Sequence, residues 1–113
     1  MTKIYHNPRC SKSRQTLQLL EQEGEDFETV LYMDSPPSAK ELTEILKQLG
    51  KKPIELVRKN EQIWKDNYKG KDLTNSQIVA AMVAHPRLIE RPIVIKNGKA
   101  ALGRPPENIL GIL

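Results

Sequence analysis

The single cysteine of this chain, Cys10, lies in the polar segment Pro8-Arg9-Cys10-Ser11-Lys12 and is the residue best suited to chemistry. A short strand is expected just before it, over 3–6, and a helix just after it, over 11–23. The free N–H groups and the dipole at the start of a helix stabilise a thiolate. We therefore expect the pKa of Cys10 to lie below that of a free thiol. The alternative is that Cys10 is a small buried apolar residue.

The residues around Cys10 limit the reactions that this cysteine could perform. His6 precedes it by one short loop, where its ring could reach the sulfur or could be a structural histidine at the strand end. Arg14 adds positive charge about one turn into the expected helix. Ser13 occupies the place of the second cysteine of a dithiol oxidoreductase, so an outside thiol such as glutathione must release a substrate bound to Cys10. A Cys-x5-Arg phosphatase loop is absent, because Thr16 stands where its arginine would be.

Three further arginines, Arg58, Arg91 and Arg104, could bind an oxyanion. Arg91 and Arg104 each directly precede a proline, which holds the backbone of the arginine extended. Guanidinium groups bind tetrahedral oxyanions in a forked geometry, so convergence of the three on Cys10 would form a binding site for a dianion. Alternatively, each is a surface residue with an ion-pair partner. In a thioredoxin-like fold, we expect the Arg91–Pro92 peptide bond to be cis and to lie beside Cys10.

The hydrophobic pattern predicts an α/β fold. We expect a thioredoxin-like four-stranded mixed sheet flanked by helices, with a helical insertion near residues 53–84, in a single domain over 1–113. Asn97-Gly98 predicts a hairpin turn, and capping boxes predict two helices that begin at Ser38 and Thr74 and end before Gly50 and His85. The other expected elements are strands over 3–6, 27–32, 91–95 and 99–102 and helices over 11–23, 53–60 and 105–113. Residues 61–73 are polar and ambiguous.

Composition limits the class of protein. Hydrophobic residues make up 38% and charged residues 28% of the 113 residues, which is typical of a globular chain. The net charge of +4 is scattered among few aromatics, so it fits a small anionic ligand and indicates no nucleic-acid surface. No apolar run reaches the roughly 20 residues that cross a bilayer, and no signal peptide is apparent, so we expect a cytoplasmic protein. One cysteine excludes an internal disulfide and a cysteine-rich zinc site, and we expect no metal and no bound cofactor.

Motifs over nearly the whole chain occur in an order that fits one known family. They are Ile4-Tyr5-His6-Asn7-Pro8-Arg9-Cys10, Ser13-Arg14, Leu31-Tyr32 with Pro36-Pro37-Ser38, Leu56-Val57-Arg58-Lys59-Asn60, His85-Pro86, Leu88-Ile89-Glu90-Arg91-Pro92-Ile93-Val94 and Gly103-Arg104-Pro105-Pro106-Glu107. The sequence resembles the glutaredoxin-linked arsenate reductases, the ArsC family of the thioredoxin-like superfamily. Ser11-Lys12 after the cysteine and the end of the chain at Leu113 are typical of the YfgD-type branch of this family.

This resemblance implies an arsenate reductase. The arsenate would be attacked by a cysteine thiolate to form a covalent adduct, glutathione and glutaredoxin would supply the electrons, and arsenite would leave. The residues that match the family's site are Cys10 as the nucleophile, His6 as the group that lowers its pKa, and Arg58, Arg91, Arg104, Arg14 and Ser13 as the substrate-binding residues.

Two other functions compete with this one. A monothiol oxidoreductase would act on glutathionylated proteins, but a disulfide substrate needs no binding site for a dianion. A regulator that binds RNA polymerase, like the Spx proteins, would carry a Cys-x-x-Cys switch, and Ser13 stands in place of its second cysteine.

Overall fold

A computed structural model of the protein describes residues 2–113, which divide into two compact units. The first unit joins the chain up to Ser35 to the segment Arg91–Leu113, and the second unit is Pro36–Glu90. The helical insertion expected near residues 53–84 falls inside the second unit, which begins earlier than predicted and takes in the helix that follows Ser38.

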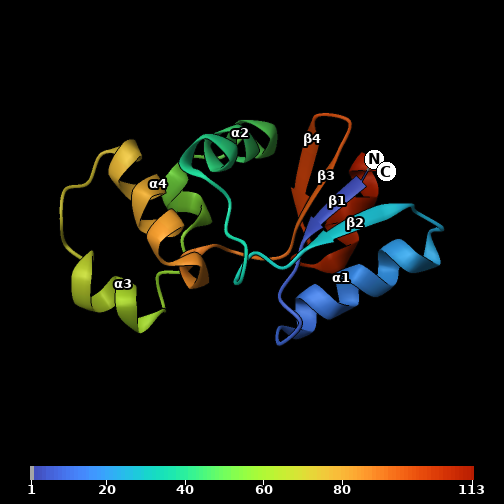
Figure 1. Ribbon diagram of the computed structural model, residues 1–113, viewed down its shortest axis with the longest axis horizontal. Coiled ribbons are helices and arrows are strands. Elements are labelled where there is room, and N and C mark those ends of the chain that lie inside the picture. The colour runs from blue at the N-terminus through green and yellow to red at the C-terminus, as the bar shows by residue number, and fades with distance from the viewer. Residues whose placement is uncertain (1) are drawn as a thin grey trace. The chain divides into compact units, whose positions relative to one another are not determined.

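The first unit contains the predicted four-stranded mixed sheet (Figure 1). The strand order is β2-β1-β3-β4, with β1 parallel to β2 and antiparallel to β3, and β3 antiparallel to β4. Asn97 and Gly98 form the expected hairpin turn, with φ of 50° and 77°. The strands are β1 (Thr2–Tyr5), β2 (Phe27–Val30), β3 (Ile93–Lys96) and β4 (Lys99–Leu102).

Two helical segments, α1 (Ser11–Gln22) and η3 (Pro106–Ile112), pack on one face of this sheet. Ile4, Leu20, Val94 and Ile109 form their shared core, and each is fully buried. Burying such a side chain contributes about 1.5–3 kcal/mol, so this cluster fixes α1 on the central strands. The last helix was predicted over 105–113, and it is a 3₁₀ helix.

The second unit is helical. Both predicted capping boxes are confirmed: the Glu41 N–H donates to Ser38 Oγ over 3.1 Å, and the Gln77 N–H donates to Thr74 Oγ1 over 3.2 Å. Gly50 ends the first helix at a φ of 68°. The elements are α2 (Ala39–Leu49), η1 (Pro53–Leu56), α3 (Gln62–Asn67), α4 (Asn75–Ala84) and η2 (Pro86–Leu88).

The predictions for residues 53–73 differ most from the structure. The helix expected over 53–60 is only the single 3₁₀ segment η1, because Val57 turns to extended backbone and pairs with Ile89. The short helix α3 was not predicted. Its buried Trp64 stacks on Tyr68 with the ring centroids 5.3 Å apart, and Tyr68 lies edge-on to His85 with centroids 6.3 Å apart. The contact with His85, which is distant in the chain, stabilises a segment whose sequence carries no apolar period.

Gly103 allows α1 to approach the start of β3 closely. Its N–H donates to the carbonyl oxygen of Pro92 over 2.9 Å, and its own carbonyl accepts from Thr16 Oγ1 over 3.4 Å. A Cβ at this position would overlap Thr16 Oγ1 and lie 2.8 Å from Pro92 Cγ. A side chain here would therefore push the cysteine-bearing helix away from Pro92.

We predict that Gly103→Ala lowers the free energy of unfolding by about 1–3 kcal/mol, as overpacking does in other cores. Urea denaturation followed by circular dichroism measures this change. The matched control is Gly111→Ala, where the new Cβ would meet no atom within 4 Å. Equal unfolding midpoints for the two variants would show that the space around Gly103 is not limiting.

Candidate active site

Cys10 occupies the N-cap position of α1, at the end of the loop that follows β1. Its N–H donates to the carbonyl oxygen of Asn7 over 3.0 Å, and its carbonyl oxygen accepts from the Arg14 N–H over 3.0 Å. The Asn7 side chain also accepts the Arg9 N–H over 3.0 Å, which closes a compact loop. Cys10 is a free cysteine and is largely buried, with 8% of its surface exposed.

The groups around the sulfur favour the thiolate. Burial raises the pKa of Cys10, but the Ser13 N–H, the positive charge of Arg91, the Lys12 N–H and the positive charge of Arg104 together bring this pKa below its ordinary value. A thiol buried among apolar groups alone would have a raised pKa. The helix start and two guanidinium groups therefore distinguish Cys10 from a structural cysteine.

Arg91 and Arg104 reach the same end of the sheet from neighbouring strands. Arg91 precedes β3 and Arg104 follows β4, and these strands pair antiparallel with Ile93 opposite Leu102. Nη1 of Arg104 lies 3.5 Å from the carbonyl oxygen of Arg91. The predicted cis peptide bond at Arg91–Pro92 is confirmed, and Arg104–Pro105 is cis as well, which was not predicted.

His6 and Ser13 form a contact that stabilises the loop before Cys10. His6 Nδ1 lies 2.6 Å from Ser13 Oγ, which also accepts the Asn7 N–H over 3.0 Å. Both side chains are buried. Burial, followed by the positive charge of Arg14, lowers the pKa of His6, so its imidazole is neutral near pH 7. The hydrogen of the Ser13 hydroxyl is then available to donate to His6 Nδ1.

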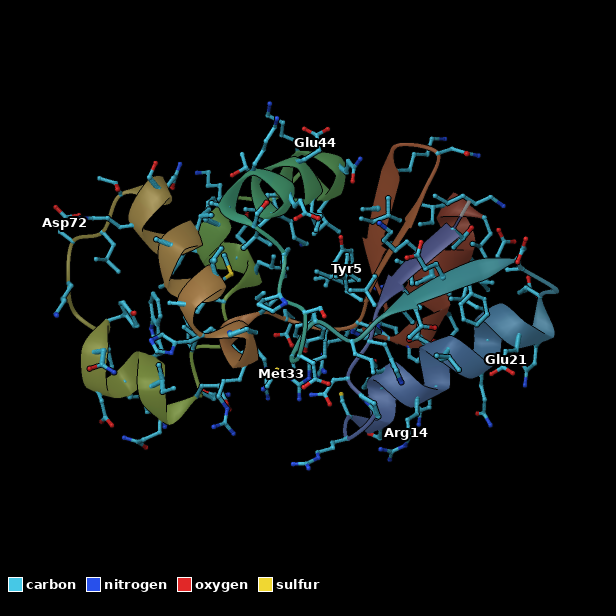
Figure 2. All side chains as sticks on the ribbon, in the orientation of Figure 1. Tyr5, Arg14, Glu21, Met33, Glu44 and Asp72 are labelled. Carbon is cyan, nitrogen blue, oxygen red and sulfur yellow. The ribbon has the colours of Figure 1, made fainter. Side chains whose placement is uncertain are left out.

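Arg14 lies in the first turn of α1 (Figure 2). Its Nη1 donates to the carbonyl oxygen of Pro8 over 2.8 Å, which ties the helix to the loop in front of Cys10. A groove of about 390 Å³ runs along this face of the helix, and the sequence did not indicate two amide side chains that line it, Gln15 and Gln18. Its other lining residues are His6, Ser11, Arg14 and Leu17.

Arg58 belongs to the second unit, where it has carboxylate partners. Its Nη1 lies 3.5 Å from Glu61 Oε2, and its Nε lies 3.8 Å from Glu90 Oε1. Its N–H donates to the carbonyl oxygen of Leu88 over 2.7 Å. The structure therefore brings His6, Ser13, Arg14, Arg91 and Arg104 together around Cys10 within one unit, and the convergence of Arg58 on this site stays a prediction.

Within residues 2–113, no group of three or more His, Cys, Asp and Glu side chains could hold a metal ion. Over the same range, no helix combines the length and apolar character needed to cross a membrane.

A lone cysteine at the start of the helix that follows the first strand, with a cis-proline before β3, defines a thioredoxin-like protein with one cysteine at this site. Residues 5–112 match the ArsC family, and the chain belongs to this family. It is 50% identical over 113 residues to the uncharacterized protein YfgD of Escherichia coli K12, covering 98% of this chain and 95% of that one.

Two further comparisons agree with this assignment. The chain is 46% identical over 113 residues to an arsenate reductase of Neisseria meningitidis serogroup B, covering 98% of this chain and 97% of its relative. The solved structure of an arsenate reductase from Vibrio cholerae matches with a TM-score of 0.95 and 46% identity, covering 99% of this chain and 97% of that one. The family resemblance seen in the sequence is thus confirmed.

We predict that Cys10 reacts with iodoacetamide at a pH below the range of an ordinary thiol, because the helix start and two guanidinium groups stabilise its thiolate. The alkylation rate as a function of pH gives the pKa directly. Arg91→Gln and Arg104→Gln should each shift the profile to higher pH, because each removes a positive charge that lowers the pKa of Cys10. Arg9→Gln, which changes an exposed arginine of the same loop, is the matched control. Superimposable profiles for all four proteins would contradict this electrostatic account.

Ser13→Ala should lower the free energy of unfolding by about 1–3 kcal/mol, because the buried His6 Nδ1 and the partly buried Asn7 N–H lose their partner. The backbone N–H of Ser13 remains, so the pKa of Cys10 should stay below that of an ordinary thiol. Urea denaturation and the alkylation profile measure the two properties separately. Ser11→Ala, at an exposed position of the same turn, is the control. An unchanged stability of Ser13→Ala would show that these buried groups find other partners.

Proposed function

We propose that this protein is an arsenate reductase in which the Cys10 thiolate is the nucleophile and glutathione and glutaredoxin are the reductants. One observation carries this proposal: the positive charges of Arg91 and Arg104 act on the same sulfur at the start of α1. A thiolate and an arsenate dianion repel each other, so their reaction needs fixed positive charge between them. Two arginines fit this need, since their forked donors match a tetrahedral oxyanion.

The remaining predicted site residues have supporting roles in this proposal. Arg58 supplies the third guanidinium group to the anion. Ser13 and Arg14 hold the loop in front of Cys10 and orient the substrate, and the contacts of Ser13 with His6 and of Arg14 with Pro8 support this role. His6 acts on the nucleophile through its contact with Ser13 in the loop, and not through a charge, because burial lowers the pKa of its imidazole and leaves the ring neutral.

The proposed reaction consumes one glutathione thiol and one glutaredoxin thiol for each arsenate, and it regenerates Cys10. The Cys10 thiolate forms a sulfur–arsenic bond and one arsenate oxygen leaves as water. The glutathione thiol replaces a second oxygen, which also leaves as water. The glutaredoxin thiol then attacks the glutathione sulfur. The electron pair of the broken arsenic–sulfur bond stays on arsenic, which is reduced from As(V) to As(III), and a glutaredoxin–glutathione disulfide forms. One water hydrolyses the last arsenic–sulfur bond, releasing arsenite and the Cys10 thiol.

Dependence on an outside thiol follows from the cysteine count. Cys10 is the single cysteine of the chain, so no second thiol of the same molecule can attack an adduct on it. The groove beside α1 supports a place for the tripeptide, because Arg14 offers a cation for a carboxylate and Gln15 and Gln18 offer amides for a peptide backbone. The cytoplasm, where glutathione keeps thiols reduced, is the compartment that suits this reaction.

The test is an assay with arsenate, glutathione, glutaredoxin, glutathione reductase and NADPH, followed by NADPH oxidation. Arsenate should sustain turnover and phosphate should not, because phosphorus is not reduced by thiols. Cys10→Ser should abolish turnover, and residual activity in this variant would place the chemistry elsewhere. Turnover of a glutathionylated peptide by the unchanged protein, without any turnover of arsenate, would instead support the monothiol oxidoreductase.

Arg91→Lys should raise the KM for arsenate about tenfold, because the loss of one charge-assisted hydrogen bond costs roughly 1.5 kcal/mol. Arg87→Lys is the matched control, since Arg87 is 62% exposed and pairs with Glu61 in the second unit. Equal KM values for the two variants would remove Arg91 from the anion site.

A further inference from the structure

The second unit contains a groove that the proposed reaction does not use. It has a volume of about 570 Å³, and its lining residues come from α2, η1, the start of α4 and the loop between α2 and η1. All of its lining residues belong to the second unit, whereas Cys10 and its hydrogen-bonded loop belong to the first. Pockets that bind small molecules usually have volumes of about 300–1,000 Å³, so this groove can hold one.

The floor of the groove is apolar. Leu46 of α2 and Val79 of α4 line it and are almost fully buried, with 4% and 6% of their surfaces exposed. Ala39 and Pro53 add further carbon surface to its walls. Contact with this floor would favour a ligand with a hydrocarbon or aromatic body.

The rim of the groove is positively charged. Lys47 lies in the last turn of α2, and Lys51 and Lys52 follow this helix before η1, so three lysines border one cavity. None of the three forms an ion pair within residues 2–113. Glu55 is the one acidic residue of the lining, and its Oε1 already accepts the Lys52 N–H over 2.8 Å. The charge of the rim is therefore complementary to an anion.

We propose that this groove is a binding site for a small amphipathic anion, a carboxylate or sulfonate with an apolar body. The apolar body would contact Leu46 and Val79, and the anionic group would lie among Lys47, Lys51 and Lys52. The ligand needs both an apolar body and an anionic group. An inorganic anion would make no contact with the apolar floor, and a neutral hydrocarbon would give the lysines no partner. This inference is independent of the reaction at Cys10.

The probe is anilinonaphthalene sulfonate, which joins an aromatic body to one negative charge. Calorimetric titration of the folded wild-type protein should show saturable binding to one site, weakened by added salt. Phenylnaphthylamine, which has the same rings without the sulfonate, should bind at least about tenfold more weakly, because it makes no use of the lysines. Absence of saturable sulfonate binding, or equal affinity for the two probes, would overturn the proposal.

Two matched pairs of variants locate the site. Lys47→Glu with Lys51→Glu should weaken sulfonate binding about tenfold or more, while Lys40→Glu with Lys69→Glu makes the same change in net charge at exposed positions outside the groove. Thr43→Trp should fill the groove and abolish binding of both probes, while Glu44→Trp adds the same bulk one residue away on α2.

Folding and the reactivity of Cys10 are the controls for these variants. Circular dichroism and the alkylation rate of Cys10 should be unchanged in all four, so a loss of probe binding reports on the groove and not on unfolding. Equal affinities within either pair would show that the probe binds elsewhere and would overturn the proposal. A failure of arsenate turnover would leave these binding results unaffected.

Discussion

A thiolate at Cys10 would place a negative charge in a largely buried position, where the chain leaves β1 and enters α1. Burial raises the pKa of Cys10, and the N–H groups of Ser13 and Lys12 and the charges of Arg91 and Arg104 more than offset this effect. The two N–H groups belong to the N-terminal segment of the first unit, and the two arginines belong to its C-terminal segment, Arg91–Leu113. The fold must therefore close the sheet between β1 and β3 before the site exists, because this pairing brings the two arginines to the cysteine.

Close packing keeps that arrangement fixed. The core formed by Ile4, Leu20, Val94 and Ile109 holds α1 against the central strands, and the absence of a side chain at Gly103 lets Thr16 approach Pro92. The buried contact between His6 and Ser13 holds the loop in front of the sulfur. None of these contacts is made by the Cys10 sulfur itself, so their effect is on the position of α1 and of the loop that carries Cys10.

The sequence predicted the parts of this structure that depend on local signals. The helix after Cys10, the capping boxes at Ser38 and Thr74 and the Asn97–Gly98 turn each follow from a few neighbouring residues, and the structure contains them all. The predictions failed where distant contacts decide. Tyr68, which stacks on Trp64 of α3, lies edge-on to His85, and Val57 becomes extended by pairing with Ile89. The cis bond at Arg104–Pro105 was not predicted, because most X-Pro bonds in folded proteins are trans.

The candidate site also contains residues that local signals predicted and residues whose position depends on distant contacts. Residues adjacent to Cys10 in the chain were identified from spacing, since a helix start brings them close whatever the rest of the fold does. Arg91 and Arg104 were suggested by the prolines after them, but their approach to the sulfur depends on the strand order β2-β1-β3-β4. Gln15 and Gln18 gave no signal, because glutamines on an exposed helix face usually serve solubility alone.

The small exposed fraction of Cys10 bears on the size of what can react there. Only 8% of the residue is exposed, so a slender thiol meets less obstruction than the broad surface of a folded protein. In the proposed reaction, glutathione would therefore be the detachable arm that reaches the adduct, and the larger protein would exchange electrons with this arm once its sulfur protrudes.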